Sequence, residues 1–149
     1  LMNGAAKVYA VDVGECALPE KLKTDARVKV MDKTNARFLT ADNLGGQCDF
    51  VCIDVSFISL ELILPAAAGL IGEGGHIIAL IKPQFEVGKK ALSKRGIVVN
   101  AWERERAVDK IRGAAAACGL LEENFTVAPV RENKNIEYLI LFTKKLLYN

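Results

Sequence analysis

Four charged side chains stand at the ends of predicted β-strands and could form one chemical site: Asp12, Asp54, Lys82 and Glu137. The first three close short apolar runs, and Glu137 begins another. In a doubly wound α/β sheet such positions lie along the carboxyl edge, where ligands bind, and an acid in the place of Asp12 binds a ribose hydroxyl. Carboxylates and an amine bind hydroxyl groups and exchange protons with them.

Each of these residues also has an ordinary structural interpretation. Asp12 could cap the next helix, and Asp54 could form an Asx turn ahead of Ser56. Lys82 could be a solvated lysine at a strand end, and Glu137 an ordinary surface acid. Convergence of all of them on one sheet edge is harder to explain in these terms, so we expect a ligand site there.

The elements that must position them alternate between strands and helices, which predicts a parallel sheet covered by helices. Pro65 inside one helical pattern should kink that helix, and Gly119 should cap another. The expected strands are residues 7–12, 27–31, 49–54 and 76–82, and the expected helices are residues 17–23, 59–71 and 102–118.

Two further strands, residues 125–130 and 137–142, are separated only by a polar turn at 131–135. Because that turn is too short for a crossover helix, the two strands should pair antiparallel. The predicted fold is therefore a mostly parallel, doubly wound Rossmann-type sheet with an antiparallel strand near its C-terminal edge. Methyltransferases of the Rossmann type have this strand, and nicotinamide-binding domains usually lack it.

The N-terminal residues 1–6 are expected to end a helix, and no glycine-rich turn precedes the strand that closes with Asp12. In doubly wound folds that turn lies about 20 residues before the ribose-binding acid. We therefore expect a first strand and its glycine loop upstream of Leu1, and a gap in the sheet without them. Residues 1–149 are interpreted as one N-terminally incomplete domain.

Residues 83–100 form a predicted loop, long enough for a functional role or for mobility. It carries Lys89, Lys90, Lys94 and Arg95 directly after Lys82. These cations could bind RNA phosphates or could simply be solvated, and the sequence favours neither.

Composition restricts the class of protein more than its function. The chain has 149 residues, of which 51% are hydrophobic, and a net charge of +2, which is compatible with RNA binding but does not argue for it. Its four cysteines include no CxxC pair and it has one histidine, so we expect reduced thiols and no metal site. The sequence has no membrane-spanning or signal segment, which predicts a cytoplasmic protein.

Three sequence blocks resemble the haemolysin A (TlyA) family of FtsJ-like RNA methyltransferases: Asp54-Val-Ser-Phe-Ile-Ser-Leu60, Leu80-Ile-Lys-Pro-Gln-Phe-Glu-Val-Gly88 and Asn135-Ile-Glu-Tyr-Leu139. The resemblance covers nearly the whole chain, and the first two blocks are specific. It implies S-adenosylmethionine as cofactor and ribosomal RNA, at a cytidine, as substrate. The family usually also carries an N-terminal S4-like RNA-binding domain.

The resemblance also implies a Lys-Asp-Lys-Glu tetrad for methylation of a ribose 2′-hydroxyl. Asp54, Lys82 and Glu137 match its last three residues, and the first lysine would lie upstream of the chain. Asp12 and Asp54 would contact the cofactor, and Asn35 would lie near its adenine.

Methyl transfer to a ribose oxygen is an in-line displacement, so placing the nucleophile supplies much of the rate. The hydroxyl benefits from losing its proton in the transition state. A lysine can take that proton near neutral pH only where nearby positive charge or burial favours its neutral form. Our hypothesis makes Lys82 the base. Asp54 and Glu137 would oppose the neutral amine, so they are interpreted as positioning groups.

Three other functions remain open at this point. A nicotinamide-dependent oxidoreductase would use Asp12 in the same way but leaves Lys82 and Glu137 unexplained. A non-catalytic RNA-binding protein could retain the fold and would be recognised by a lack of cofactor binding. A membrane-active toxin, which the haemolysin name suggests, has no amphipathic or membrane-spanning segment to support it.

Overall fold

The computed structural model describes residues 1–129 and 134–145, and its strands fall into two sheets. The smaller sheet pairs β1 (Val8–Val11) in parallel with β2 (Val28–Met31). The larger has the strand order β3-β4-β6-β5. Its strands are β3 (Cys48–Ile53), β4 (Ile71–Ile81), β5 (Leu120–Val127) and β6 (Tyr138–Lys144). The separation of β1 from β3 agrees with the gap expected in the sheet.

Strand β6 is antiparallel to both of its neighbours, β4 and β5, whereas β3 and β4 are parallel. This confirms the predicted pairing of the last two strands and the mixed character of the sheet. Tyr138 lies opposite Ile81 on one side and Val127 on the other. The turn expected at residues 131–135 lies mostly outside the described residues.

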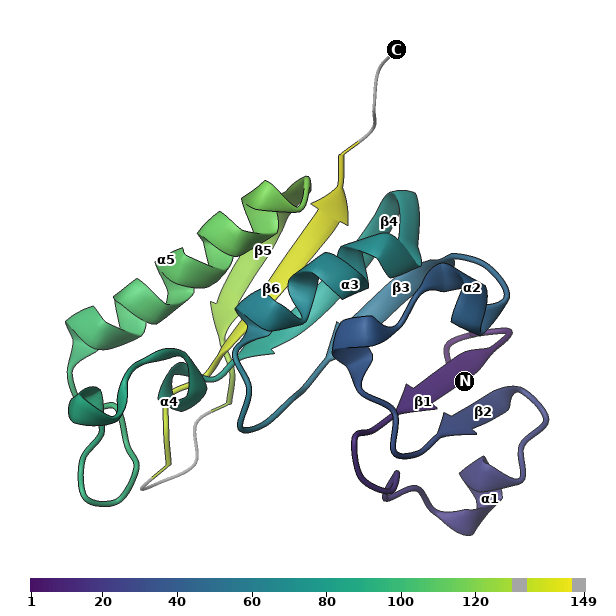
Figure 1. Cartoon of the computed structure of the whole chain (residues 1–149), viewed down its shortest axis with the longest axis horizontal. Coiled ribbons are helices and arrows are strands. Elements are labelled where there is room, and N and C mark those ends of the chain that lie inside the picture. The colour runs from purple at the N-terminus through teal and green to yellow at the C-terminus, as the bar shows by residue number, and fades with distance from the viewer. Residues whose placement is uncertain (130–133, 146–149) are drawn as a thin grey trace.

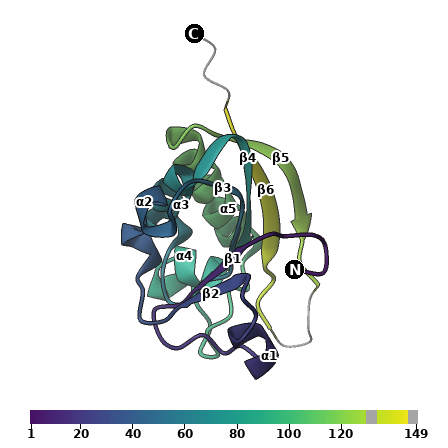
Figure 2. The ribbon, with the colours of Figure 1, turned by 90° about the vertical axis from the view of Figure 1, so that its right-hand side faces the viewer.

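Two helices, α3 (Leu64–Leu70) and α5 (Ala101–Ala117), cover the same face of the four-stranded sheet (Figure 1), and the edge-on view in Figure 2 shows strands on one side and helices on the other. Among the described residues, the two-sided helical cover of a doubly wound sheet is therefore not seen. Ile77, Ile81 and Phe142 point into this core beside Ile111 of α5, each at most 1% exposed. Burying such side chains stabilises the fold by about 1.5–3 kcal/mol each.

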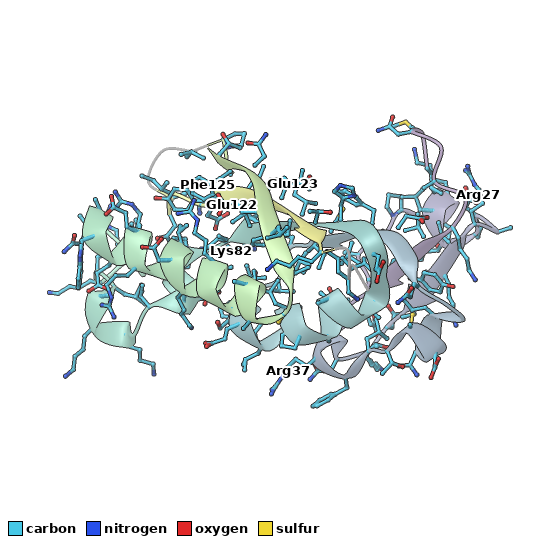
Figure 3. All side chains as sticks on the ribbon, turned by 90° about the horizontal axis from the view of Figure 1, so that it is seen from above. Arg27, Arg37, Lys82, Glu122, Glu123 and Phe125 are labelled. Carbon is cyan, nitrogen blue, oxygen red and sulfur yellow. The ribbon has the colours of Figure 1, made fainter. Side chains whose placement is uncertain are left out.

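Strand β5 is also held to α5 by charge. The guanidinium of Arg112 pairs with Glu122 at 2.7 Å and lies 4.7 Å from the centre of the Phe125 ring. Figure 3 shows Glu122 and Phe125 next to each other on β5. The contact lowers the pKa of Glu122, because the hydrogen bond from Arg112 favours the carboxylate.

A second, smaller core joins the two sheets. Its buried residues are Leu39, Leu70 and Leu44, the last residue of α2 (Ala41–Leu44). Side chains of β1, β2 and β3 pack against it, namely Tyr9, Val11, Met31, Cys48 and Val51. The Tyr9 hydroxyl also donates a hydrogen bond to the backbone carbonyl of Leu44. Apolar packing rather than strand pairing therefore places Asp12 relative to the larger sheet.

The helix expected over residues 59–71 is wrong in its extent. A 3₁₀ turn, Leu60–Leu62, comes first, and α3 begins only at Leu64. Pro65 therefore lies in the first helical turn, where its missing N–H costs no hydrogen bond, and it causes no kink. The last expected helical residue, Ile71, already belongs to β4. That strand bends at Gly74 (φ +71°) and Gly75, where a Cβ would lie 2.9 Å from the Cβ of Ile71.

Four other boundaries also differ from the expectation. The strand expected over residues 125–130 is β5, Leu120–Val127, which begins directly after Gly119. Residues 1–6 form a turn and no helix. The helix expected over residues 17–23 is only α1 (Glu20–Lys23), because Pro19 precedes it as N-cap. The predicted loop 83–100 contains α4 (Pro83–Glu86) and a 3₁₀ turn, Lys89–Ala91. Helix α5, in contrast, agrees with the expectation, and Gly119 follows its C-cap with a φ of +74°.

Candidate active site

Lys82 and Asp54 form an ion pair at the carboxyl ends of two adjacent parallel strands, β4 and β3. Lys82 Nζ lies 2.6 Å from Asp54 Oδ1 and donates a second hydrogen bond to Ser56 Oγ at 3.1 Å. The Lys82 side chain is 15% exposed, whereas that of Asp54 is 69% exposed. The amine is thus held in one position at the rim of the sheet, and the carboxylate beside it faces solvent. Asp54 pairs with Lys82 and is therefore more than a turn residue.

Glu137 directly precedes β6 and belongs to the same edge. Tyr138 pairs with Ile81 in an antiparallel register. The residue before Tyr138, Glu137, therefore lies beside the residue after Ile81, Lys82. The Glu137 side chain is fixed by Gln84, whose Nε2 donates to Glu137 Oε1 at 2.7 Å. The structure thus brings Asp54 and Lys82 into direct contact and places Glu137 at the neighbouring strand end.

Asp12 ends β1 and organises the turns that follow β1 and β2. Its Oδ1 accepts a hydrogen bond from the Gly14 amide at 2.7 Å, and its carbonyl accepts one from the Thr34 amide at 2.9 Å. It does not cap α1, whose N-cap is Pro19. Asp12 therefore presents an exposed carboxylate from a fixed backbone.

An open hollow of about 460 Å³ lies next to that backbone. Asn35 lines it, and its Oδ1 accepts a hydrogen bond from the Arg37 amide at 3.1 Å, which caps the 3₁₀ turn Ala36–Phe38. The other lining residues combine apolar and polar side chains: Met31, Lys33, Thr34, Phe38, Leu39 and Asn43. A flat heterocycle can pack on such a surface while Asp12, one hydrogen bond away along the backbone, accepts from the hydroxyls of an attached sugar. The residues present therefore fit an adenosine group.

The four predicted RNA-binding cations are all exposed, in two groups. Lys89 and Lys90 lie in the 3₁₀ turn, while Lys94 and Arg95 lie at the tip of a closed turn. That turn is closed by hydrogen bonds between Ser93 and Ile97, 2.9 Å from amide to carbonyl and 3.1 Å from amide to hydroxyl.

Asn135 fastens this basic turn to the segment that carries Glu137. Its Oδ1 accepts from the Val98 amide at 2.9 Å, and its Nδ2 donates to the Gly96 carbonyl at 3.0 Å. A single side chain therefore connects the basic turn with the start of β6. Asn135 begins the third of the sequence blocks described above, but its position in the sequence predicted no role for it.

The sequence also predicted no role for Glu86, which is a buried carboxylate. Its side chain is 1% exposed and accepts hydrogen bonds from the Ser59 hydroxyl, from the Leu60 amide at 2.8 Å and from Lys110 Nζ at 3.3 Å. Lys110 also pairs with Glu61 at 3.0 Å. We call these five residues the Glu86 cluster. It ties the segment after Asp54 to the segment after Lys82 and joins both to α5.

The cluster determines the charge of its own lysine. Burial by itself would lower the pKa of Lys110, but the hydrogen bond with Glu61 and the charge of Glu86 outweigh it and raise that pKa. Lys110 thus remains a cation that neutralises the buried Glu86. The available signal for this cluster was the specificity of the first two sequence blocks. Ser59 and Glu86 are among the polar residues of these blocks to which the proposed tetrad gave no role.

The remaining reactive groups do not form a second site in the part of the chain that the structure describes. The cysteines are free, and burial raises the pKa of all four thiols. No group of three or more possible metal-binding side chains occurs among residues 1–129 and 134–145. Within the same residues, no helix is both long and apolar enough to cross a membrane.

Comparison with known proteins identifies the family of the chain. The family model of FtsJ-like methyltransferases matches residues 1–144. The Bacillus subtilis protein YqxC is 42% identical over 94% of this chain and 50% of its own length. The 16S/23S rRNA (cytidine-2′-O)-methyltransferase TlyA of Mycobacterium tuberculosis is 40% identical over 94% of this chain and 53% of its own. The chain thus spans about half the length of these curated relatives.

Solved structures extend the comparison to the fold. A Lactococcus lactis protein, 36% identical, superposes with a TM-score of 0.91 over 97% of this chain and 70% of that one. S-adenosylmethionine-dependent methyltransferases of only 13–15% identity superpose with TM-scores of 0.58–0.69, which shows the shared fold alone. The chain has the α/β fold of these methyltransferases and belongs to the TlyA/haemolysin A family of FtsJ-like methyltransferases.

Proposed function

We propose that this chain transfers a methyl group from S-adenosylmethionine to the 2′-hydroxyl of a cytidine in ribosomal RNA, in the cytoplasm. The observation that carries the proposal is the Lys82–Asp54 ion pair of 2.6 Å at the carboxyl edge of the sheet, with Glu137 at the adjacent strand end. The relative from M. tuberculosis, named for cytidine 2′-O-methylation of 16S and 23S rRNA, supports the choice of substrate.

Asp12 and the hollow beside Asn35 are the proposed holding points for the cofactor. The carboxylate of Asp12 would accept hydrogen bonds from its ribose hydroxyls, and the hollow would take its adenine. When bound, S-adenosylmethionine supplies an electrophilic methyl group on a positively charged sulfur. Asp54, with a 69% exposed side chain, provides a nearby negative charge at the same edge of the sheet.

The reacting hydroxyl would be held and deprotonated by the strand-end groups. Lys82 Nζ is the proposed acceptor of the hydroxyl proton once it has lost the proton that it holds in the ion pair with Asp54, a loss that the positive charge of the bound cofactor would favour. Its mostly buried stem leaves it few orientations. Asp54 and Ser56 fix Nζ at 2.6 and 3.1 Å, and Glu137 would orient the hydroxyl from the adjacent strand. The deprotonated oxygen is the better nucleophile for the in-line displacement.

RNA would approach over the exposed cations that follow Lys82. Lys89, Lys90, Lys94 and Arg95 can bind backbone phosphates, and such contacts hold RNA in register without reading its bases. Asn135 fixes the turn with Lys94 and Arg95 to the segment that carries Glu137. RNA held by this turn therefore has a defined position relative to the reacting groups.

The test combines cofactor binding with methylation, both in the intact protein. Calorimetric titration measures binding of S-adenosylmethionine, with NAD as the comparison. Transfer of labelled methyl groups is then measured on ribosomal subunits purified from cells that lack the gene. We expect binding of S-adenosylmethionine alone and, for Lys82→Ala, a loss of roughly 10²–10⁴-fold in rate, the usual contribution of a general base.

Each alternative gives a different result in these assays. Preferential binding of NAD would indicate an oxidoreductase, and RNA binding without binding of S-adenosylmethionine would indicate a non-catalytic protein. Methylation by Lys82→Ala at the wild-type rate would refute the assignment of the base. A product whose new methyl group is on a base instead of a ribose oxygen would refute the proposed acceptor.

A further inference from the structure

Gln84 lies in α4, two residues after Lys82 and two before Glu86, and contacts the proposed site through Glu137. Its Nε2 donates to Glu137 Oε1 at 2.7 Å, and both residues are partly buried. A hydrogen bond of an amide to a carboxylate is short and directional, so it restricts the rotation of the carboxylate. Gln84 thus connects the end of β4 with the start of β6 at the level of Lys82.

The other end of the same amide has no partner. Gln84 Oε1 is buried and accepts no hydrogen bond from the described residues. A buried acceptor in this state destabilises a fold, and native proteins contain few of them. Methionine, which has a similar length and no acceptor oxygen, would avoid this cost. The fold alone therefore does not explain a glutamine at this position.

The backbone around Gln84 is held on both sides. The Phe85 amide donates to the Lys82 carbonyl at 2.9 Å, and the Val87 amide donates to the Pro83 carbonyl at 3.0 Å. Beyond the turn, Glu86 is fixed by the Ser59 hydroxyl and the Leu60 amide. Since the backbone of α4 has little freedom, the Gln84 amide reaches Glu137 from a fixed origin.

We propose that Gln84 is a positioning residue, which holds the Glu137 carboxylate in a single orientation beside Lys82. The inference rests on the proposed function and assigns to Gln84 a part in the same reaction. Without the amide, Glu137 would be solvated instead, because it is partly exposed. Water satisfies its charge but does not fix its direction. Loss of Gln84 should therefore reduce the rate of methyl transfer and leave the fold intact.

The first test replaces Gln84 by methionine in the intact protein, with Gln47→Met as the matched control. Gln47 is the other glutamine of the chain and is exposed. For Gln84→Met we expect kcat for methylation of ribosomal subunits to fall by roughly 10–100-fold, as misplacement of a reacting group does. KM for the subunits and the Kd of S-adenosylmethionine should remain those of the wild type. The midpoint of thermal unfolding should be equal or higher, since the unpaired acceptor is gone.

The second test asks whether Gln84 acts through Glu137. In a double-mutant cycle, Gln84→Met should reduce kcat in the wild-type background and have no further effect in a Glu137→Gln background. A wild-type protein that transfers no methyl group would refute the proposed function itself. If the wild type is active, three results would overturn the inference about Gln84 alone: unchanged kcat in Gln84→Met, a lowered unfolding midpoint, or independent effects of the two substitutions.

Discussion

Replacement of Glu86 by alanine should destabilise the protein substantially, although Glu86 touches no reacting group in the proposed mechanism. Its side chain is 1% exposed and accepts from the Ser59 hydroxyl, the Leu60 amide and Lys110. Hydrogen bonds to a charged group contribute about 1.5–3 kcal/mol each, and removal of one partner of a buried ion pair costs about 3–5 kcal/mol. The Lys110 side chain is 36% exposed, so in the variant water would solvate its ammonium group and reduce the cost of losing the ion pair.

We therefore expect the free energy of unfolding to fall by about 2–4 kcal/mol in Glu86→Ala. For a domain of this size, the unfolding midpoint would decrease by roughly 5–15 °C. Methylation should fall as well, because the segments after Asp54 and Lys82 lose their common anchor. Glu86→Gln should be intermediate, since its amide oxygen can still accept from the Leu60 N–H. Thermal and urea unfolding followed by circular dichroism measures the first effect.

Glu61→Ala is the matched control, because Glu61 pairs with the same lysine at 3.0 Å but has a 52% exposed side chain. Exposed ion pairs contribute about 0–1 kcal/mol, so this variant should unfold close to the wild type. Equal stabilities of Glu86→Ala and Glu61→Ala would refute the reasoning, because the expected difference rests on the burial of the Glu86 carboxylate and on its hydrogen bonds to Ser59 and Leu60.

Three further predictions concern the cofactor and the RNA. Asp12→Ala should raise the Kd of S-adenosylmethionine, measured by calorimetry, by about 10–100-fold, because hydrogen bonds to a charged group are removed. An unchanged Kd would contradict the role of Asp12. Replacing Lys94 and Arg95 together by alanine should weaken RNA binding, and the slope of log K against log salt should become shallower by about 0.7–0.9 for each phosphate that the protein no longer neutralises. Filter binding at several salt concentrations measures this slope, and an unchanged slope would mean that both side chains are simply solvated. Asn135→Ala removes two hydrogen bonds of about 0.5–1.5 kcal/mol each, so trypsin should cleave after Lys94 or Arg95 faster than in the wild type. Equal cleavage rates would show that other interactions hold the turn.

The fold was predictable from the sequence where strands and helices have distinct periodicities. The four strand cores before residue 83 and helix α5 agree with the apolar patterns, and the short turn before β6 correctly predicted its antiparallel pairing. Periodicity failed around residues 62–71, where the sequence is continuously apolar and suits either a helix or a buried strand. In that region Pro65 determines where α3 begins, because proline fits only a first helical turn. The start of β4 is determined by the pairing of Ile71 with Cys48 of β3.

The candidate site was predictable in its residue types but not in its contacts. Asp54, Lys82 and Glu137 were found because each lies at a strand end, a position that local pattern reveals. The partner of Gln84, Glu137, lies 53 residues away in the sequence. The partners of Glu86, Leu60 and Ser59, lie 26 and 27 residues away. No local pattern encodes such contacts, because they depend on the register of β6 against β4 and on the path after β3.

The sequence from Lys82 to Glu86 illustrates why a motif can be more specific than its catalytic residue requires. Three polar side chains in this one turn reach three different elements: Lys82 contacts Asp54 after β3, Gln84 contacts Glu137 before β6, and Glu86 contacts Ser59 and α5. Lys82 is the N-cap of α4 and Pro83 is its first residue, so all three side chains start from this one short helix and its cap. A substitution at any of these positions would displace a neighbouring segment as well as its own side chain. The block is therefore constrained by the geometry of the whole sheet edge, and a protein that retained only the lysine would lack the means to hold Glu137 beside it.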